Sequence, residues 1–103
     1  MTSLYVHATL KVRIGGYERF CVALAKMVPI LEGCGWRLMG AWVTLVGRVY
    51  TVIDLWEIPD ANSFFDATAI MRAHPAFPAI HEVLSEVVEE EVVTMVKKAP
   101  YSP

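Results

Sequence analysis

The sequence predicts an α+β domain of the ferredoxin-like class, with the element order β-α-β-β-α-α-β and a four-stranded antiparallel sheet. The first observation behind this prediction is that strand-like runs with a two-residue hydrophobic period alternate with segments of helical period. The second is that glycine or proline stands at most of the boundaries between these segments. The 103 residues show no repeat and no break in composition, so we expect a single domain over residues 1–103.

The first strand and the first helix have clear local signals. Residues 4–13 alternate between apolar and polar side chains, which is typical of a strand with one buried face. The pair Gly15-Gly16 ends this run. A helix follows, and we expect it to end at Gly33 or Gly35. Its apolar residues recur at helical spacing: Phe20, Leu24, Met27 and Leu31.

A hairpin comes next. Its strands are predicted over residues 36–45 and 48–58, with a turn around Gly47. Both strands carry tryptophan and β-branched residues, which are favoured on a pleated, half-buried surface. We therefore expect these two strands to be neighbours in the sheet.

Two helices and a last strand are predicted in the second half of the chain. Asp60 is the expected N-cap of a helix over residues 61–72. Pro75 disfavours helical geometry in the residue before it, so a separate helix runs from Pro75 to about Glu86. Residues 90–97 then form the last strand, which completes the sheet.

A sheet with its helices on one face leaves the other face bare. In the first strand the apolar set should pack on the helices, so Tyr5, His7 and Thr9 are expected on the bare face. In the third strand we expect these residues toward the helices: Val49, Thr51, Ile53 and Leu55. The opposite set is then Tyr50, Val52, Asp54 and Trp56. Two such sheets placed face to face would enclose a cavity lined by the bare-face residues.

Four short stretches carry a resemblance to a known family. They are Gly40, Trp42, Thr44 and Gly47; Leu55-Trp56; His74-Pro75-Ala76-Phe77; and Pro100-Tyr101-Ser102-Pro103. In this order and spacing the chain resembles the NIPSNAP family of the dimeric α/β-barrel superfamily. The resemblance implies a homodimer in which two sheets pair as a barrel. Family members often carry His where this chain has Asp54. The superfamily includes oxygenases, isomerases, cyclases and haem-degrading enzymes, so the fold alone selects no reaction.

His7 and Asp54 are the predicted catalytic pair, since both are expected in mid-strand on the bare face. A histidine beside a carboxylate can act as a general base, while the carboxylate fixes its tautomer and stabilises the imidazolium. The alternative is that His7 is a hydrogen-bonded interior or interface residue. Asp54 would then pair with Arg13, Arg37 or Arg48.

Five residues are predicted to bind the substrate, because they combine apolar bodies with polar tips. They are Tyr5, Thr9, Trp42, Tyr50 and Trp56. The alternative is that the aromatic members form a dimer core or pack a corner of the sheet. The predicted function is a cofactor-independent enzyme of the oxygenase, isomerase or cyclase type, acting on an apolar aromatic or polyketide-like molecule. A non-catalytic ligand-binding or protein-interaction module is the alternative.

His81 adds a haem-binding monooxygenase as a third alternative. The chain resembles haem-degrading monooxygenases of the same superfamily in placing His81 four residues after Phe77. Those enzymes also use an asparagine and a tryptophan. This chain has His7 near the first of these positions and Phe65 near the second, so two of the three residues depart from the haem-binding pattern. We therefore expect no cofactor. No metal site is expected either, since the sequence has no HxH, HExxH or CxxC spacing.

Composition restricts the partners. Hydrophobic residues make up 55% of the chain, which is hard to bury in so short a monomer, so we expect a homodimer. The net charge is −2 and no basic cluster occurs, so no nucleic-acid partner is expected. No signal peptide and no membrane-spanning run are visible, and Cys21 and Cys34 suggest no disulfide framework. A cytoplasmic location without a membrane partner is the expectation.

Overall fold

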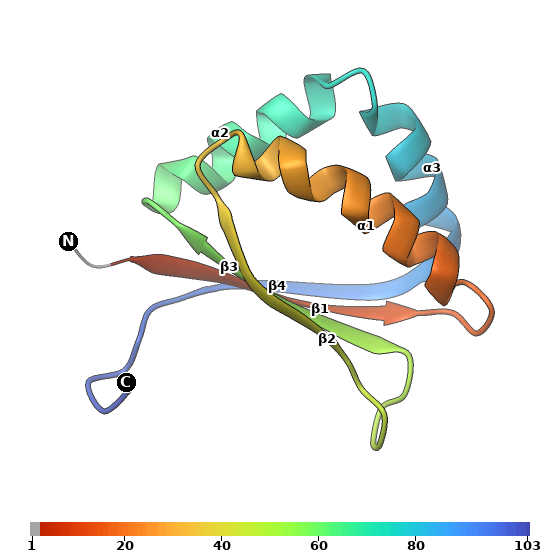
Figure 1. The fold of residues 1–103 in the computed structure, drawn as a ribbon, viewed down its shortest axis with the longest axis horizontal. Coiled ribbons are helices and arrows are strands. Elements are labelled where there is room, and N and C mark those ends of the chain that lie inside the picture. The colour runs from red at the N-terminus through yellow and green to blue at the C-terminus, as the bar shows by residue number, and fades with distance from the viewer. Residues whose placement is uncertain (1–2) are drawn as a thin grey trace.

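The computed structural model describes residues 3–103, which form three helices on one face of a four-stranded antiparallel sheet (Figure 1). In chain order the elements are β1 (Leu4–Val12), α1 (Tyr17–Glu32), β2 (Arg37–Val43), β3 (Thr51–Ile58), α2 (Ala61–Ala73), α3 (Phe77–Val87) and β4 (Val88–Val96). The strand order in the sheet is β2-β3-β1-β4. The predicted element order and ferredoxin-like fold are confirmed. Within the described part of the chain, no helix has the length and apolar character needed to cross a membrane.

The β2–β3 hairpin is shorter in its strands and longer in its turn than predicted. β2 ends at Val43 and β3 begins at Thr51. Gly47 has φ +109° and Tyr50 has φ +61°, so both lie in the left-handed region, which is incompatible with regular strand pairing. Tyr50 therefore belongs to the turn, and the prediction that it lies in the third strand was wrong.

The two faces of β3 are the reverse of the prediction. In the antiparallel pairing of β1 with β3, Ala8 lies opposite Asp54 and His7 lies opposite Leu55. The apolar set of β1 packs on the helices as expected, so Asp54 faces the helices as well. The helix-facing residues of β3 are Val52, Asp54, Trp56 and Ile58, all of them buried. Thr51, Ile53 and Leu55 lie on the other face.

The core has two clusters along the layer between helices and sheet. One combines Val6, Leu31, Trp36, Trp56, Ile58, Ala67 and Met71. The other combines Ala8, Leu10, Val12, Phe20, Val52 and Val87. Aromatic rings meet in the first cluster, where the Trp36 ring lies 5.7 Å from that of Trp56 and 6.0 Å from that of Phe64. In the register of β3, Asp54 falls between Val52 of the second cluster and Trp56 of the first.

The sheet face opposite the helices is here called the open face. Its residues follow from the strand register: Tyr5, His7, Thr9, Lys11, Arg37, Gly40, Trp42, Thr51, Ile53, Leu55, Glu57, Glu90, Val92, Thr94 and Val96. No helix of the described chain covers this face (Figure 1). Trp42 is 55% exposed and Val92 is 52% exposed. The open face thus presents apolar side chains to solvent in the single chain.

Candidate functional site

A cavity of about 210 Å³ lies between the helices and the sheet, and is here called the Asp54 cavity. Its floor comes from β1, β3 and β4, and its roof comes from all three helices. Floor residues include Ala8, Asp54 and Glu91, and roof residues include Leu24, Met71 and Leu84. Most of this lining is apolar, so a carboxyl group is unusual there.

A second cavity of about 290 Å³, here called the β2-side cavity, lies beneath the other flank of α1. Its walls come from α1, β2 and β3. Leu24, Asp54 and Trp56 line both cavities. Asp54 therefore sits at the junction of two apolar hollows that together flank α1.

The Asp54 side chain is buried, and the described residues give it no partner. The residue is 5% exposed, and in residues 3–103 no side-chain hydrogen bond or ion pair reaches its carboxyl group. No side-chain polar atom in this part of the chain is both fully buried and unpartnered, so the carboxyl oxygens keep access to the cavity space. Burial raises the pKa of Asp54, because the apolar surroundings disfavour the charged form. A buried carboxyl with a raised pKa in a cavity is a candidate acid–base group.

The alternative predicted for Asp54, an ion pair with an arginine, is not seen in the described residues. Arg37 pairs instead with Glu57, with an Nη2 to Oε1 distance of 3.0 Å. Arg13 donates from Nη1 to the backbone carbonyl of Glu86 at 3.3 Å. Asp54 is thus a lone carboxyl facing a cavity.

His7 and Asp54 lie on opposite faces of the sheet. His7 is half-buried on the open face, where its neighbours across the strands are Leu55 and Thr94. The predicted geometry, in which Asp54 orients His7 as a general base, was therefore wrong. The physical reason is the strand register, since adjacent residues of a strand point to opposite faces.

The structure divides the five predicted substrate-binding residues. Trp56 is buried and lines both cavities, and Trp42 reaches the edge of the β2-side cavity. Tyr5 and Thr9 lie on the open face, where the Tyr5 hydroxyl donates to Glu57 Oε2 at 3.5 Å. Tyr50 lies in the hairpin turn, outside both cavities. The predicted set is therefore not brought together in one place.

The NIPSNAP family model matches residues 5–103. This chain belongs to the NIPSNAP family. Among curated proteins, no match is found.

Solved structures of the family have the same architecture. An uncharacterized NIPSNAP domain protein from Burkholderia xenovorans is 19% identical with a TM-score of 0.81, over 97% of this chain and 98% of that chain. A NIPSNAP family protein from Agrobacterium tumefaciens is 19% identical with a TM-score of 0.83, over 98% and 97%. Another from the same organism, described as having unknown function, is 16% identical with a TM-score of 0.85, over 99% and 93%. At these identities the likeness establishes the fold.

Sequence reasoning missed most of the residues that line the Asp54 cavity in this NIPSNAP chain. Glu91 is the clearest case, because it stands in a run of three glutamates that resembles a solvated junction. The two-residue alternation of β4 could have identified Glu91, since this residue lies on the same helix-facing side of the strand as Val93. Leu24, Phe64 and Leu84 show the spacing of ordinary helix core residues, and nothing in the sequence marks them as residues of a cavity.

The described residues of the NIPSNAP domain offer little support for a metal or haem ligand. No group of three His, Cys, Asp or Glu side chains in residues 3–103 is placed to hold a metal ion. His81 is exposed on α3, with its ring centroid 5.2 Å from that of Phe77 and Nδ1 3.5 Å from Ser85 Oγ. It lines neither the Asp54 cavity nor the β2-side cavity.

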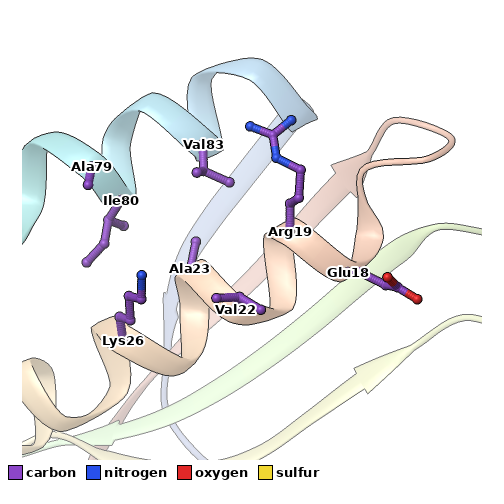
Figure 2. A pocket seen from close by; sticks show the side chains of 8 residues that line it. All are labelled: Glu18, Arg19, Val22, Ala23, Lys26, Ala79, Ile80 and Val83. Atoms are coloured by element: carbon purple, nitrogen blue, oxygen red, sulfur yellow. The ribbon is translucent and has the colours of Figure 1, made fainter.

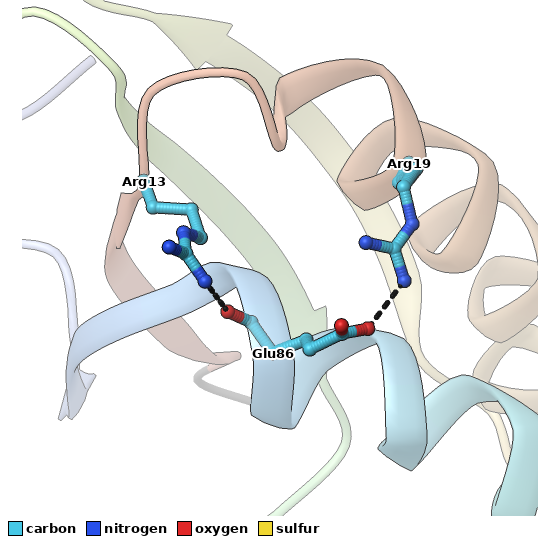
Figure 3. Close-up of polar contacts among 3 residues, drawn as sticks. All are labelled: Arg13, Arg19 and Glu86. Carbon is cyan, nitrogen blue, oxygen red and sulfur yellow. Dashed lines mark hydrogen bonds and ion pairs between the residues drawn. The ribbon is translucent and has the colours of Figure 1, made fainter.

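A third hollow of about 320 Å³ lies on the outer surface between α1 and α3 (Figure 2). Its charged residues are exposed, and Glu18 points away from the other lining side chains (Figure 2). Arg19 is bound to Glu86, with Nη2 2.6 Å from Oε2, and this pair lowers the pKa of Glu86 (Figure 3). Because this outer groove holds no buried acid–base group, the Asp54 cavity is the better candidate site.

Proposed function

We propose that this NIPSNAP protein binds an apolar small molecule in the Asp54 cavity and that Asp54 moves a proton on it without a cofactor. The observation that carries this proposal is the Asp54 carboxyl group, which is buried, open to an apolar cavity and without a partner among residues 3–103. Folding such a group costs free energy that an apolar side chain would not cost. A functional role in proton transfer explains why the site holds a carboxyl group.

The chemistry follows from the raised pKa of Asp54. A carboxylate whose pKa is raised by burial is a stronger base than one in water, and its protonated form can return the proton later. Removal of a proton from carbon or oxygen gives an enolate or phenolate. This is a first step shared by isomerases, cyclases and those oxygenases in which O2 then reacts with the anion.

The cavity also restricts the substrate. An apolar cavity of about 150 Å³ can hold benzene, and the Asp54 cavity is about 210 Å³. Trp36, Trp56 and Phe64 line it, so an aromatic or polyketide-like ring with an acidic C–H or O–H group fits the lining. A larger substrate would extend past Asp54 into the β2-side cavity.

Deuterium exchange tests the proton transfer without knowledge of the natural substrate. Aryl ketones and cyclic monoketones such as 2-tetralone are incubated with the protein in D2O, and loss of the C–H signal next to the carbonyl group is followed by NMR. We expect the wild-type protein to accelerate exchange of a panel member, and Asp54→Asn to lower that rate by about 10²- to 10⁴-fold. Asp66→Asn, the same change at an exposed position of α2, is the matched control and keeps the wild-type rate. Equal rates for Asp54→Asn and wild type would show that Asp54 is not the base.

A non-catalytic ligand-binding module is the second candidate, favoured by the lack of any acid–base side chain hydrogen-bonded to Asp54 in residues 3–103. Binding of the neutral probe 2-phenylethanol separates the two candidates. The probe should shift the NMR signals of the Trp36 and Trp56 indole groups, and Leu84→Phe should block it by filling the cavity. Binding without exchange of any panel member supports the module, and absence of both rejects the cavity as the site.

We also propose that a second copy of the chain covers the open face, giving the expected homodimer. Exposed Trp42 and Val92 and the half-buried Ile53 support it, because such a surface is unusual in a monomer. Tyr5, His7 and Thr9 would then be interface residues. Ile53→Arg should yield monomers in sedimentation velocity, while Ile70→Arg on the outer side of the helix layer should leave the dimer intact. A monomeric wild-type protein would reject the proposal.

We further propose a reducing, cytoplasmic location for this protein, which its free cysteines, Cys21 and Cys34, support.

A further inference from the structure

The charged groups of the Asp54 cavity have one sign. As residues 3–103 form it, its lining contains two carboxylic acids, Asp54 and Glu91, and no lysine, arginine or histidine. The lining of the β2-side cavity adds no basic side chain either. An anionic ligand would therefore meet two carboxyl groups and no cation, which opposes its binding.

The strand register arranges this lining along β1. Trp56 lies opposite Val6, Asp54 opposite Ala8, and on the other flank of β1 Glu91 lies opposite Leu10. Alternate residues of a strand are about 7 Å apart. The cavity thus has an aromatic end at Trp56 and an acidic end between Asp54 and Glu91.

The aromatic end is built from three rings. Trp36 lies edge-on to Trp56 and is stacked with Phe64, and all three line the cavity. The Trp36 indole N–H already donates to the backbone carbonyl of Ser63 at 3.2 Å. This end therefore offers apolar ring surface to a ligand and leaves the polar recognition to the carboxyl groups.

The acidic end has two carboxyl groups in different environments. Asp54 is buried and has no partner in the described part of the chain, and Glu91 is exposed. Glu89, on the same strand, is within 3.9 Å of Lys11, whereas no ion pair involves Glu91 in residues 3–103. One carboxyl group is thus deep in the cavity and a second is free at its solvent side.

We propose that the ligand of this cavity is a small organic amine, with its ammonium group between Asp54 and Glu91 and its apolar body against Trp36, Trp56 and Phe64. This inference rests on the proposed function, in which the Asp54 cavity is the ligand site. An ammonium group supplies the hydrogen-bond donors that Asp54 lacks, and its positive charge also stabilises the anion that forms on the ligand when Asp54 removes a proton. The aromatic rings add favourable contact with a cation or with a ring of the ligand.

Three probes of similar shape and different charge test the inference: 2-phenylethylamine, 2-phenylethanol and phenylacetate. Their dissociation constants are measured at pH 7 from the NMR shifts of the Trp36 and Trp56 indole groups. We expect the amine to bind about tenfold or more tightly than the alcohol, because hydrogen bonds to charged groups are the stronger ones. Phenylacetate should bind more weakly than either.

Variants locate the preference for the amine. Asp54→Asn and Glu91→Gln should each reduce the ratio of amine to alcohol affinity, while the affinity for the alcohol changes little. Glu90→Gln removes the same charge from the next residue of β4, which lies on the open face, and should keep the wild-type ratio. A fall in the ratio for Glu90→Gln equal to that for Glu91→Gln would mean that net charge, and not the cavity, sets the preference.

The outcomes separate this inference from the proposed function. If the alcohol binds as tightly as the amine and Leu84→Phe blocks both, the amine inference is wrong and the cavity remains a ligand site. If none of the three probes shifts the tryptophan signals and no panel member exchanges, both proposals fail. Exchange that depends on Asp54, without binding of the amine, overturns the amine inference alone. A preference for the amine that survives in Asp54→Asn and Glu91→Gln alike also overturns the inference.

Discussion

Ala8 lies directly opposite Asp54 in the pairing of β1 with β3, and this relationship places the carboxyl group beneath the helices. Ala8 is small, so it leaves space beside Asp54 that a larger residue would fill. The same pairing puts His7 opposite Leu55 on the other side of the sheet. The register of two strands thus decides which ionisable groups can act together, and it assigns Asp54 to a cavity without a histidine.

The first prediction concerns the stability of Asp54→Asn. Burial raises the pKa of Asp54 above its ordinary value of 3.8, so the folded protein holds this proton more tightly than the unfolded chain. The free energy of unfolding therefore falls as pH rises from about 3.8 through the raised folded-state pKa. Asparagine has nearly the same shape and no charge. We expect Asp54→Asn to be more stable than wild type at pH 8, with the gain shrinking toward pH 4.

Thermal unfolding at several pH values checks this prediction. Each unit of pKa difference between folded and unfolded states corresponds to about 1.4 kcal/mol, which in a domain of this size raises Tm by several degrees. Asp66→Asn, on the exposed surface of α2, should show no such pH-dependent gain. An Asp54→Asn protein less stable than wild type at pH 8 would mean that a favourable interaction holds the carboxylate.

The order of elements could be predicted because its signals are local. The alternation over β1, the glycine pair before α1, and the cap at Asp60 each depend on a few neighbouring residues. The length of the β2–β3 turn was less accessible, since it depends on Tyr50 adopting a left-handed conformation. Local patterns therefore predict the order of the elements, but they do not predict where the two strands of the hairpin end.

The face of β3 could not be predicted reliably because both of its alternating sets are largely apolar. Asp54 stands among helix-facing residues, so it breaks the rule that polar side chains point away from the core. At the end of the strand, polar Glu57 and apolar Ile58 do indicate the correct faces, with Glu57 on the open face and Ile58 toward the helices. Asp54 could be named as a site residue from the sequence. The residues around it could not, because their positions depend on the pairing of strands that are far apart in the sequence. Such failures of patterning are expected where a residue serves function and not stability.

The second prediction concerns the contact between Gly16 and Val87. A Cβ atom at Gly16 would lie 2.8 Å from the Cβ and Cγ1 atoms of Val87, the buried last residue of α3. Gly16→Ala should therefore lower the free energy of unfolding by about 1–3 kcal/mol, a typical cost of overpacking. Chemical denaturation measures it. Gly33→Ala, at an exposed helix end, is the control and should cost less; equal costs would contradict the steric explanation.

The third prediction concerns the N-cap of α2, the helix that carries Phe64 and Met71 to the cavity. Asp60 Oδ1 accepts hydrogen bonds from the Ser63 backbone N–H at 2.9 Å and from the Ser63 hydroxyl at 3.0 Å. Asp60→Ala should cost about 1 kcal/mol of stability and speed amide exchange in the first turn of α2. Asp60→Asn retains an acceptor and should cost less. If Asp60→Asn costs as much as Asp60→Ala, the carboxylate charge, and not the cap geometry, stabilises the helix.

The fourth prediction concerns Gly40 and the Trp42 ring that lies over it. A Cβ atom at Gly40 would be 2.4 Å from Trp42 Cη2 and 2.6 Å from Cζ2. Trp42 is 55% exposed, so its ring is free to rotate away. Gly40→Ala should therefore change the stability of the single chain by less than about 1 kcal/mol, and it should change the fluorescence of Trp42.

A Trp42→Phe background provides the control for that fluorescence change. Trp36 and Trp56 are buried on the helix side, so Gly40→Ala should leave the emission of Trp42→Phe unchanged. Trp42 also belongs to the open face that the proposed homodimer buries. Displacement of its ring should then weaken dimerisation in sedimentation experiments, with little effect on probe binding beneath the helices. An unchanged dimer together with displaced Trp42 fluorescence would place this ring outside the contact between the two copies.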